Sequence, residues 1–430
     1  MNSRFKIYVL LASGILPLAL SPAAAQQRRF VAYFPEWGIY SGGRYYVPAD
    51  VPADRLTHIN YAFIKPIDTN ADGYYECAFN DNWAAKQHDF SKSRVVPGTA
   101  AGENIGLLNQ LRRLRAWRQE NGQVLPLIFS IGASSVRDRF SAIASNSTHR
   151  QRFVDSCIQL LQQESFDGFD IDWESPTSAE TANYTGLLQA FRDALIVLGN
   201  NQRTGAPYLL TAAVSGAKAK IDVLDVVAIA PILDWVNVMI YDFHGCWGNN
   251  HTGHNSPLRG SAEDPHTGYS GDAAIREWLR RGMPAAKINL GLAYYGRAAK
   301  ELLNAGPNPS YPGRYAALDP ARNSSPNCVV GSFSSTGGTF DYWDIVQRFV
   351  NVNGYLRYWD AEQEVPYLNN PNDPASYWIS YDDPNSISTK VHYARNMNLG
   401  GVFAWELSLE SQPQPPKTYP LTDAAARCLN

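Results

Sequence analysis

The sequence has little net charge, few cysteines and, beyond its first residues, no long apolar run. A formal net charge of −3 over 430 residues excludes the strongly basic surface that nucleic-acid-binding proteins carry, and it gives no attraction to an anionic membrane. No internal repeat or low-complexity linker divides the chain. The sequence therefore predicts a globular protein without a nucleic-acid partner. Its 45% hydrophobic content suffices for a large buried core.

Cysteine is scarce and odd in number, with no CxxC spacing, so the chain is not a small disulfide framework. The five residues are Cys77, Cys157, Cys246, Cys328 and Cys428. An oxidising compartment permits disulfides, and Cys246 with Cys328 is the pair we expect. Cys157 lies on the apolar face of a predicted helix, so we expect it to be a buried thiol.

The first residues have the pattern of a secretory signal. Arg4 and Lys6 form a basic start, residues 7–20 are apolar, and Ala23-Ala24-Ala25 is a small-residue cleavage site. The apolar run is short and contains a proline, which disfavours a membrane anchor. We expect residues 1–25 to be removed, leaving a secreted protein that is extracellular or periplasmic.

Short apolar runs alternate with amphipathic helical runs along the rest of the chain. The helical runs include residues 105–119, 150–163, 181–198, 271–281 and 386–398. This alternation predicts an α/β fold, a (β/α)8 TIM barrel. The eight predicted strands cover residues 30–34, 56–63, 125–131, 168–173, 208–214, 235–241, 287–293 and 401–405.

The connection after the seventh predicted strand is longer than an ordinary loop and rich in aromatic, strand-like runs. We interpret it as a small inserted α+β domain, residues 298–383, which divides the barrel into residues 26–297 and 384–430. Because it follows a strand, it belongs to the carboxyl-end face of the barrel, where active sites of this fold lie.

The segment from Phe166 to Glu174 is the most informative part of the sequence. Side chains alternate along a strand, so Asp170, Asp172 and Glu174 point to one face, with successive carboxylates roughly 7 Å apart. Asp167 breaks this alternation and is interpreted as a strand-entry residue. Burying three acids together costs stability, which favours a catalytic role. The opposite face is apolar: Phe169, Ile171 and Trp173.

Two other interpretations of these acids remain open at this point. One is a solvated edge strand, which the large apolar residues of the opposite face disfavour. The other is a divalent-metal site, for which neighbouring strands offer no further acidic cluster or histidine pair. The 11 Trp and 24 Tyr residues are equally ambiguous, because aromatic rings fill a core as readily as they line a carbohydrate groove.

At this point the residues resemble a known family, glycoside hydrolase family 18, the chitinases. Asp167-Gly168-Phe169-Asp170-Ile171-Asp172-Trp173-Glu174 resembles its DxxDxDxE signature. Four further segments resemble family motifs in the same order: Phe129-Ser130-Ile131-Gly132, Met239-Ile240-Tyr241-Asp242-Phe243-His244-Gly245, Tyr294-Tyr295-Gly296-Arg297 and Gly400-Gly401-Val402-Phe403-Ala404-Trp405-Glu406. The insertion resembles that of the deep-groove members.

The sequence also departs from the family pattern. Ala133 replaces the second glycine of the SxGG motif, and Ser134 stands where deep-groove members have an aromatic residue. Ser175 follows the glutamate where tyrosine is usual. The loss of an aromatic at Ser134 is expected to remove a stacking surface and to weaken binding of crystalline substrate and processivity.

The resemblance implies a retaining hydrolysis in which the acetamide group of the substrate acts as nucleophile. Glu174 is then the general acid, which needs a raised pKa. Asp172 orients the acetamide, Asp170 lies behind it and modulates the pair, and Tyr241 donates to the acetamide carbonyl. The expected substrate-binding residues are Asp242, Met239, Trp405, Tyr33, Trp247, Arg297, Tyr295, Trp37 and Ser130, with Ser130 bonded to Asp170 and Trp405 as the floor of the groove.

The sequence thus predicts a secreted chitinase that hydrolyses β-1,4-linked N-acetylglucosamine polymers, acting as a monomer on chitin or its oligosaccharides without a cofactor. His251 and His254 lack a third metal ligand and are interpreted as polar loop residues. Two alternatives remain: a non-catalytic chitin-binding lectin of the same fold, or an endo-β-N-acetylglucosaminidase. Lectin relatives usually lack the glutamate or the neighbouring aspartate, and the endo-enzymes often lack the insertion.

Overall fold

The computed structural model describes residues 28–40, 44–92, 94–202, 207–247, 250–335, 337–373 and 375–429. The predicted signal segment, residues 1–25, lies outside the described residues. No helix in the described ranges is long and apolar enough to cross a membrane.

Within the described residues, eight parallel strands close into a barrel, because β1 pairs with both β14 and β2. This confirms the predicted TIM barrel, and every predicted strand coincides with an observed one. Both faces of most strands are buried, which explains their nearly continuous apolar sequences. The strands are β1 (Arg29–Pro35), β2 (His58–Ile67), β4 (Leu127–Gly132), β5 (Gly168–Asp172), β6 (Leu209–Ser215), β7 (Trp235–Met239), β8 (Ile288–Ala293) and β14 (Gly401–Trp405).

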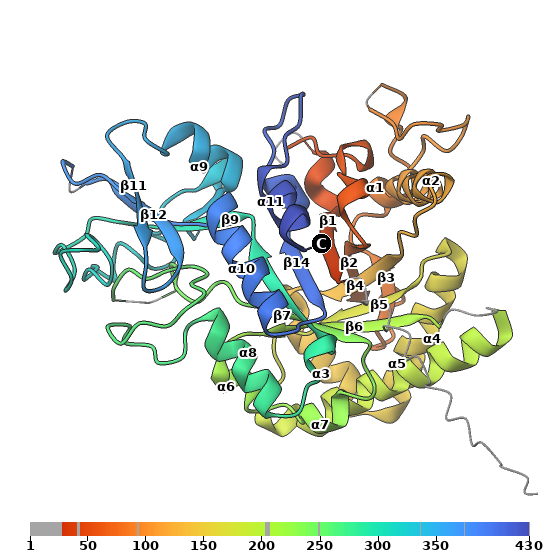
Figure 1. The fold of residues 1–430 in the computed structure, drawn as a ribbon. Helices are drawn as coiled ribbons and strands as arrows, with labels where there is room; N and C mark the ends of the chain where they lie inside the picture. The colour runs from red at the N-terminus through yellow and green to blue at the C-terminus, as the bar shows by residue number, and fades with distance from the viewer. Residues whose placement is uncertain are drawn as a thin grey trace, which may run out of the picture.

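Helices surround this barrel and bury their apolar faces against the strands (Figure 1). Their starts are capped by polar side chains: Asn146 accepts the Thr148 N–H at 2.8 Å, and Asp383 caps α10 at its first turn. The helices are α1 (Asn82–Lys86), α2 (Leu107–Glu120), α3 (Arg137–Ser145), α4 (Ser147–Glu164), α5 (Thr181–Gln202), α6 (Lys218–Ile221), α7 (Val226–Ile229), α8 (Gly271–Arg280), α10 (Pro384–Asn396) and α11 (Pro420–Leu429).

The long connection after β8 forms a second, antiparallel sheet in the described part of the chain, in the order β10-β9-β13-β12-β11. Figure 1 shows it projecting from one side of the barrel together with α9. β9 spans the predicted boundary at residues 297 and 298 and pairs with both β10 and β13. The elements are β9 (Tyr295–Lys300), β10 (Thr339–Asp341), α9 (Tyr342–Arg348), β11 (Leu356–Asp360), β12 (Val365–Asn369) and β13 (Tyr377–Ser380).

Two short segments beyond the barrel strands were not anticipated from the sequence. The 3-10 helix η1 (Glu36–Ile39) follows β1, and the strand β3 (Glu76–Phe79) pairs antiparallel with the end of β2. α1 follows β3 and contacts η1. These segments build up one side of the carboxyl-end face.

Two disulfides cross-link the chain. The predicted pair Cys246–Cys328 is confirmed, with Cα atoms 5.9 Å apart. The prediction of a free thiol at Cys157 was wrong, because Cys157 bonds to Cys77 with a Cα separation of 4.9 Å. The apolar face of α4 that carries Cys157 packs against β3, which carries Cys77, and β3 was not predicted. Cys428 is the cysteine left free in the described chain.

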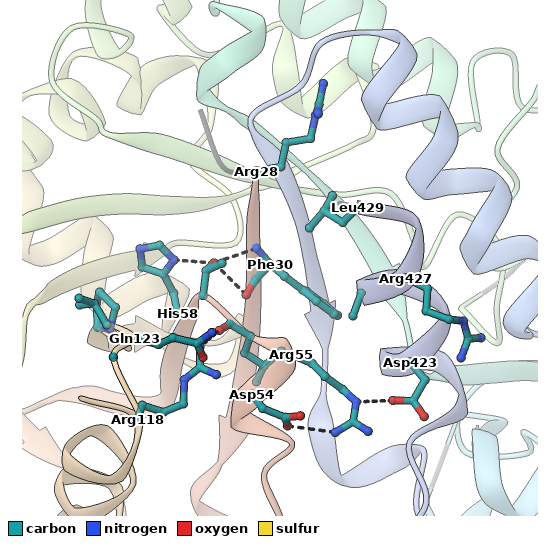
Figure 2. A pocket seen from close by; sticks show the side chains of 16 residues that line it. Arg28, Phe30, Asp54, Arg55, His58, Arg118, Gln123, Asp423, Arg427 and Leu429 are labelled. Carbon is teal, nitrogen blue, oxygen red and sulfur yellow. Dashed lines mark hydrogen bonds and ion pairs between the residues drawn. The ribbon is translucent and has the colours of Figure 1, made fainter. Parts of the chain in front are cut away.

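A cavity of about 840 Å³ opens at the amino-terminal end of the barrel, shown in Figure 2. Arg28 and Thr57, which precede β1 and β2, line it. Arg55 forms ion pairs with Asp54 and Asp423 on its wall. Because active sites of this fold lie at the opposite, carboxyl end, we place the candidate site there and not in this cavity.

Candidate active site

The three acids of the fourth barrel strand lie as the alternation predicted. Asp170 and Asp172 are 0% and 4% exposed on β5, and Glu174 follows two residues later. β5 pairs with β4 on one side and β6 on the other, so the alternative of a solvated edge strand was wrong. The opposite face packs against the outer helices: Phe169 contacts Phe191, and Trp173 contacts Phe140.

Asp170 is held by a set of hydrogen bonds from neighbouring strands. Its Oδ2 accepts from the hydroxyls of Tyr33 at 2.7 Å and Ser130 at 2.9 Å, and the Ser130 hydrogen bond is the predicted one. Its Oδ1 accepts from Thr211 at 2.5 Å and Asn237 at 3.3 Å. Burial raises the pKa of Asp170, and these four donors oppose the rise. With donors on both oxygens, Asp170 offers no free lone pair for a metal ion.

Thr211 and Asn237 were missed by sequence reasoning. Both lie on strands next to or near β5, and Thr211 is in direct register with Asp170. Their only sequence signal is a polar residue inside an otherwise apolar strand run, which predicts an inward-facing hydrogen bond but not its partner.

Asp172 is buried without a full set of partners. Its Oδ1 makes no hydrogen bond to any described residue. Burial, and then the nearby charges of Glu174 and Asp170, raise the pKa of Asp172 well above its usual value. A buried oxygen without a partner is costly, so it marks a place where a ligand group can supply the missing hydrogen bond.

Glu174 has the electrostatics of a general acid. Burial raises its pKa to about 7, the negative charge of Asp242 adds to the rise, and a hydrogen bond from the Ser134 backbone N–H opposes it. At neutral pH a substantial fraction of this carboxyl group therefore carries a proton, as proton donation to a leaving group requires.

The end of β7 brings the predicted sugar-binding residues together. Asp242 Oδ1 accepts the Tyr295 hydroxyl at 2.7 Å and the Arg297 guanidinium, whose Nε lies at 2.8 Å. The ring of Tyr241 lies 6.0 Å from that of Tyr295. Burial and the nearby Tyr295 and acids raise the pKa of Tyr241 well above its usual value, so its hydroxyl stays a donor. Met239, the last residue of β7, is partly buried beside them.

An aromatic cavity of about 160 Å³ adjoins Asp242. Trp405 lines it, with ring centroids 6.3 Å from Trp37 and 5.7 Å from Phe63. Trp247 lies outside this cavity, against Arg297, whose Cζ is 5.0 Å from the indole centroid. The cavity is lined by Trp37, Arg44, Asp242, Tyr295, Arg297, Thr339, Trp405, Glu406 and Leu409. Arg44 and Glu406 were not predicted to line the cavity. Arg44 lies in a loop, and nothing in the sequence around it indicates which cavity it reaches.

The two histidines have structural partners. His254 is buried between Ser380 and Asp360, each 3.1 Å away, and His251 bonds to the Thr252 carbonyl at 2.9 Å. Among the described residues, no group of three His, Cys, Asp or Glu side chains has an arrangement that could hold a metal ion.

A closed parallel barrel with a row of acids at one strand end, beside an aromatic cavity, is the architecture of a glycoside hydrolase. The family model "Glycosyl hydrolases family 18" matches residues 29–410, so the chain belongs to this family.

The relatives agree with this assignment. Chitinase A1 of Niallia circulans is 34% identical over 93% of the chain, and the chain spans 59% of that relative's length. Among solved structures, chitinase ChiA74 from Bacillus thuringiensis superposes with a TM-score of 0.80 at 30% identity, covering 94% of this chain and 70% of that one. Human YKL-39, described as a pseudo-chitinase with retained chitooligosaccharide binding, has a TM-score of 0.73 at 25% identity over 94% and 99% of the two chains.

Proposed function

We propose that the protein is a secreted chitinase that hydrolyses β-1,4-linked N-acetylglucosamine polymers with retention of configuration. The observation that carries this proposal is the pairing of two different carboxyl groups. Glu174 has a pKa of about 7, while the neighbouring Asp172 has a buried oxygen without a hydrogen-bond partner among the described residues. One group is suited to give a proton, and the other to bind an N–H group of the substrate.

In the first step, protonated Glu174 donates its proton to the glycosidic oxygen as the bond to the leaving sugar breaks. The carbonyl oxygen of the acetamide attacks the anomeric carbon and forms a cyclic oxazolinium ion. Asp172 accepts the acetamide N–H through its free Oδ1 and stabilises the positive charge. Tyr241 donates to the carbonyl oxygen, and Trp405 supports the sugar ring.

In the second step, the Glu174 carboxylate takes a proton from water, and that water attacks the anomeric carbon. The oxazolinium opens, the acetamide is restored and Glu174 is again protonated. Two displacements at one carbon give overall retention.

The hydrogen bonding of Asp170 argues against this residue as the nucleophile of a two-carboxylate route. A nucleophilic carboxylate needs an oxygen free to reach the anomeric carbon. Both oxygens of Asp170 are engaged by Tyr33, Ser130, Thr211 and Asn237, and the residue is fully buried. Asp170 acts on Asp172 through its charge, which adds to burial and to the charge of Glu174 in raising the pKa of Asp172.

The proposal extends to the expected setting of the enzyme. We infer an extracellular or periplasmic monomer that binds chitin or its oligosaccharides and needs no cofactor. The presence of both Glu174 and Asp172 favours catalysis over the non-catalytic lectin, although a pseudo-chitinase has a similar fold. The insertion between β8 and β14 favours a chitinase over an endo-β-N-acetylglucosaminidase acting on N-glycans.

The decisive test compares N-acetylated and deacetylated substrates of equal length. We expect the enzyme to cleave the N-acetylglucosamine hexamer and to leave the glucosamine hexamer intact, because the second lacks the internal nucleophile. Product analysis by chromatography, with a released N-glycan as a third substrate, separates the alternatives. Efficient cleavage of the glucosamine hexamer contradicts the mechanism, and cleavage of the N-glycan alone supports the endo-enzyme.

A further inference from the structure

Two amides and one arginine continue the hydrogen bonding of Asp170 toward the amino-terminal end of the barrel. Asn237 donates to Asp170 Oδ1 at 3.3 Å, and its own Oδ1 accepts from Nδ2 of Asn289 at 3.0 Å. Asn289 Oδ1 in turn accepts from Nε of Arg29, the first residue of β1, at 3.1 Å. Both asparagines are fully buried inside the barrel. The inner relay of Arg29, Asn289 and Asn237 thus joins a cation at one end of the barrel to an acid of the candidate site.

The strand register explains how Arg29 reaches across the barrel. Asn237 of β7 pairs directly with Asn289 of β8. Asn289 is in register with Gly401 of β14, and Gly401 is in register with Arg29 of β1. Gly401 has no side chain to stand between Arg29 and Asn289. A Cβ atom at the neighbouring Gly400 would lie 1.8 Å from Nη2 of Arg29, so the guanidinium occupies space that a larger residue there would fill.

The two ends of the inner relay fix the direction of every hydrogen bond in it. A guanidinium can only donate, so the amide oxygen of Asn289 must face Arg29. The amide nitrogen of Asn289 then faces Asn237, and the amide nitrogen of Asn237 faces Asp170. Because hydrogen bonds in a row polarise one another inside a protein, the positive end of each amide dipole points toward the carboxyl group. This arrangement favours the ionised form of Asp170, since a donor stabilises a carboxylate more than a neutral acid.

Arg29 carries its charge at neutral pH. Burial lowers the pKa of Arg29 to about 10, and the charge of Asp234 opposes this shift, so the guanidinium stays protonated at neutral pH. The ring of Trp235 lies 4.8 Å from its Cζ, and the Ala286 carbonyl accepts from its Nη2 at 2.6 Å. These contacts hold the cation at the start of the relay. The other titratable groups on which Arg29 acts are His58 and Lys287.

We propose that the inner relay holds Asp170 in its ionised form, so that Arg29 is a positioning residue that acts on the candidate site from the opposite end of the barrel. This inference rests on the proposed function, because it concerns how the acids of that site share their protons. The relay itself touches no substrate. Its effect passes through Asn289 and Asn237 to one carboxylate oxygen.

The charge on Asp170 has a consequence for its neighbour. Burial, and then the charges of Glu174 and Asp170, raise the pKa of Asp172. Without the relay, Asp170 takes up a proton more readily, and the pair first loses a proton at a higher pH. The acid limb of kcat/KM reports this ionisation, because a negative charge on the pair stabilises the oxazolinium ion of the proposed mechanism. The other titratable groups near Asp170 are the hydroxyls of Tyr33 and Tyr184, whose pKa values burial raises.

The test is the pH profile of kcat/KM for the N-acetylglucosamine hexamer. Asn289→Leu breaks the relay with a side chain of similar size, and Arg29→Met removes its cation. Each is expected to move the acid limb to higher pH by about 0.5 pH unit or more, about a threefold change in proton affinity. Arg29→Lys keeps the charge and a donor, so its limb should lie close to that of the wild type. Arg28→Met, the matched control, removes the same charge one residue earlier, where Nε has no hydrogen-bond partner among the described residues.

Carbon-13 NMR of labelled aspartate carboxyl groups gives a second reading that does not depend on turnover. The signal of Asp170 is the one that Asp170→Asn removes. The apparent pKa of this signal is expected to be higher in Asn289→Leu and Arg29→Met than in the wild type, and unchanged in Arg28→Met. A role of the relay in stability alone would leave the titration in place and lower kcat/KM equally at every pH.

Three outcomes contradict the inner relay: an unmoved acid limb and carboxyl titration in the variants of Asn289 and Arg29, an equal shift in Arg28→Met, or an equal shift in Arg29→Lys and Arg29→Met. Should Asn289→Leu fold poorly, Arg29→Met decides by itself, since Arg29 lies at the edge of the barrel. A wild-type protein that does not cleave the hexamer overturns the proposed function, and the carboxyl titration then still decides on the relay. Normal wild-type cleavage with unmoved profiles in the variants overturns only the relay.

Discussion

Arg297 places two guanidinium nitrogens on one oxygen of Asp242, with Nε at 2.8 Å and Nη2 at 2.7 Å from Oδ1. Together with burial, the charge of the same carboxylate acts on Glu174 and raises its pKa. Asp242 therefore links Tyr295 and Arg297 to Glu174, which makes the protonation of Glu174 sensitive to a residue that follows another strand.

The pH profile is expected to reflect this link. Glu174 acts in its protonated form and has a pKa of about 7, so kcat/KM should fall as the pH rises through that value. Asp242→Asn removes a charge that raises this pKa, so the alkaline limb should move to lower pH. Asp138→Asn, at a side chain that is 95% exposed, should leave the profile in place. An unshifted limb in Asp242→Asn contradicts the coupling.

Glu174→Gln should separate catalysis from binding. The amide cannot donate a proton of suitable acidity, so kcat should fall at least about 100-fold. The cavity around Trp405 is unchanged, so calorimetry should still detect binding of the N-acetylglucosamine hexamer. Glu120→Gln, on the exposed end of α2, is the control. Near-normal turnover in Glu174→Gln removes Glu174 from the role of acid.

Thr211 offers a test of the support beneath Asp170. Thr211→Val keeps the shape of the side chain but removes the donor 2.5 Å from Asp170 Oδ1. We expect the free energy of unfolding to fall by about 1–3 kcal/mol in denaturant titrations, since a buried carboxylate loses a hydrogen bond. Thr211→Ser retains the hydroxyl and should preserve both stability and turnover. Equal behaviour of the two variants shows that the hydrogen bond is unimportant.

The two disulfides give a matched comparison. They close loops of 80 and 82 residues, so removing either pair should cost a similar roughly 4–5 kcal/mol in stability. Only Cys246 adjoins Trp247, which forms a backbone bridge to Ser324 and packs on Arg297. Cys246→Ser with Cys328→Ser should therefore raise the KM for oligosaccharides.

Cys77→Ser with Cys157→Ser is the control for that comparison, because it joins β3 and α4 away from Trp247. Thermal unfolding and steady-state kinetics on both double variants provide the two readouts. The positioning of Trp247 by the disulfide is contradicted if both pairs change KM equally.

The barrel and its row of acids were predictable because they depend on local pattern. Alternation alone placed Asp170 and Asp172 on the inner face of β5, and the apolar strand runs predicted burial on both sides. The hydrogen bond from Ser130 to Asp170 followed from the motif resemblance. Sequence patterns describe what lies along one element, so these features were accessible without a structure.

The missed features all depend on which elements meet. Thr211 pairs with Asp170 through strand register, which no single strand sequence specifies. Cys157 was misassigned because its partner Cys77 lies on a short strand that has no strong periodicity. Asp81 accepts the Tyr40 hydroxyl and caps the helix that carries Trp83. These residues come from two separate loops, which lie close together because α1 packs on η1.

Arg44 joins parts of the chain that are far apart in sequence. Its guanidinium binds Asp341 of β10 through Nε at 2.7 Å and Nη2 at 2.9 Å, and it lies 3.9 Å from Glu406, just after β14. The insertion is thereby fastened at the seam where the first and last strands of the barrel meet. Arg44 therefore ties one wall of the cavity beside Trp405 to the barrel by ion pairs on two sides, so the insertion cannot move away from that cavity without breaking them.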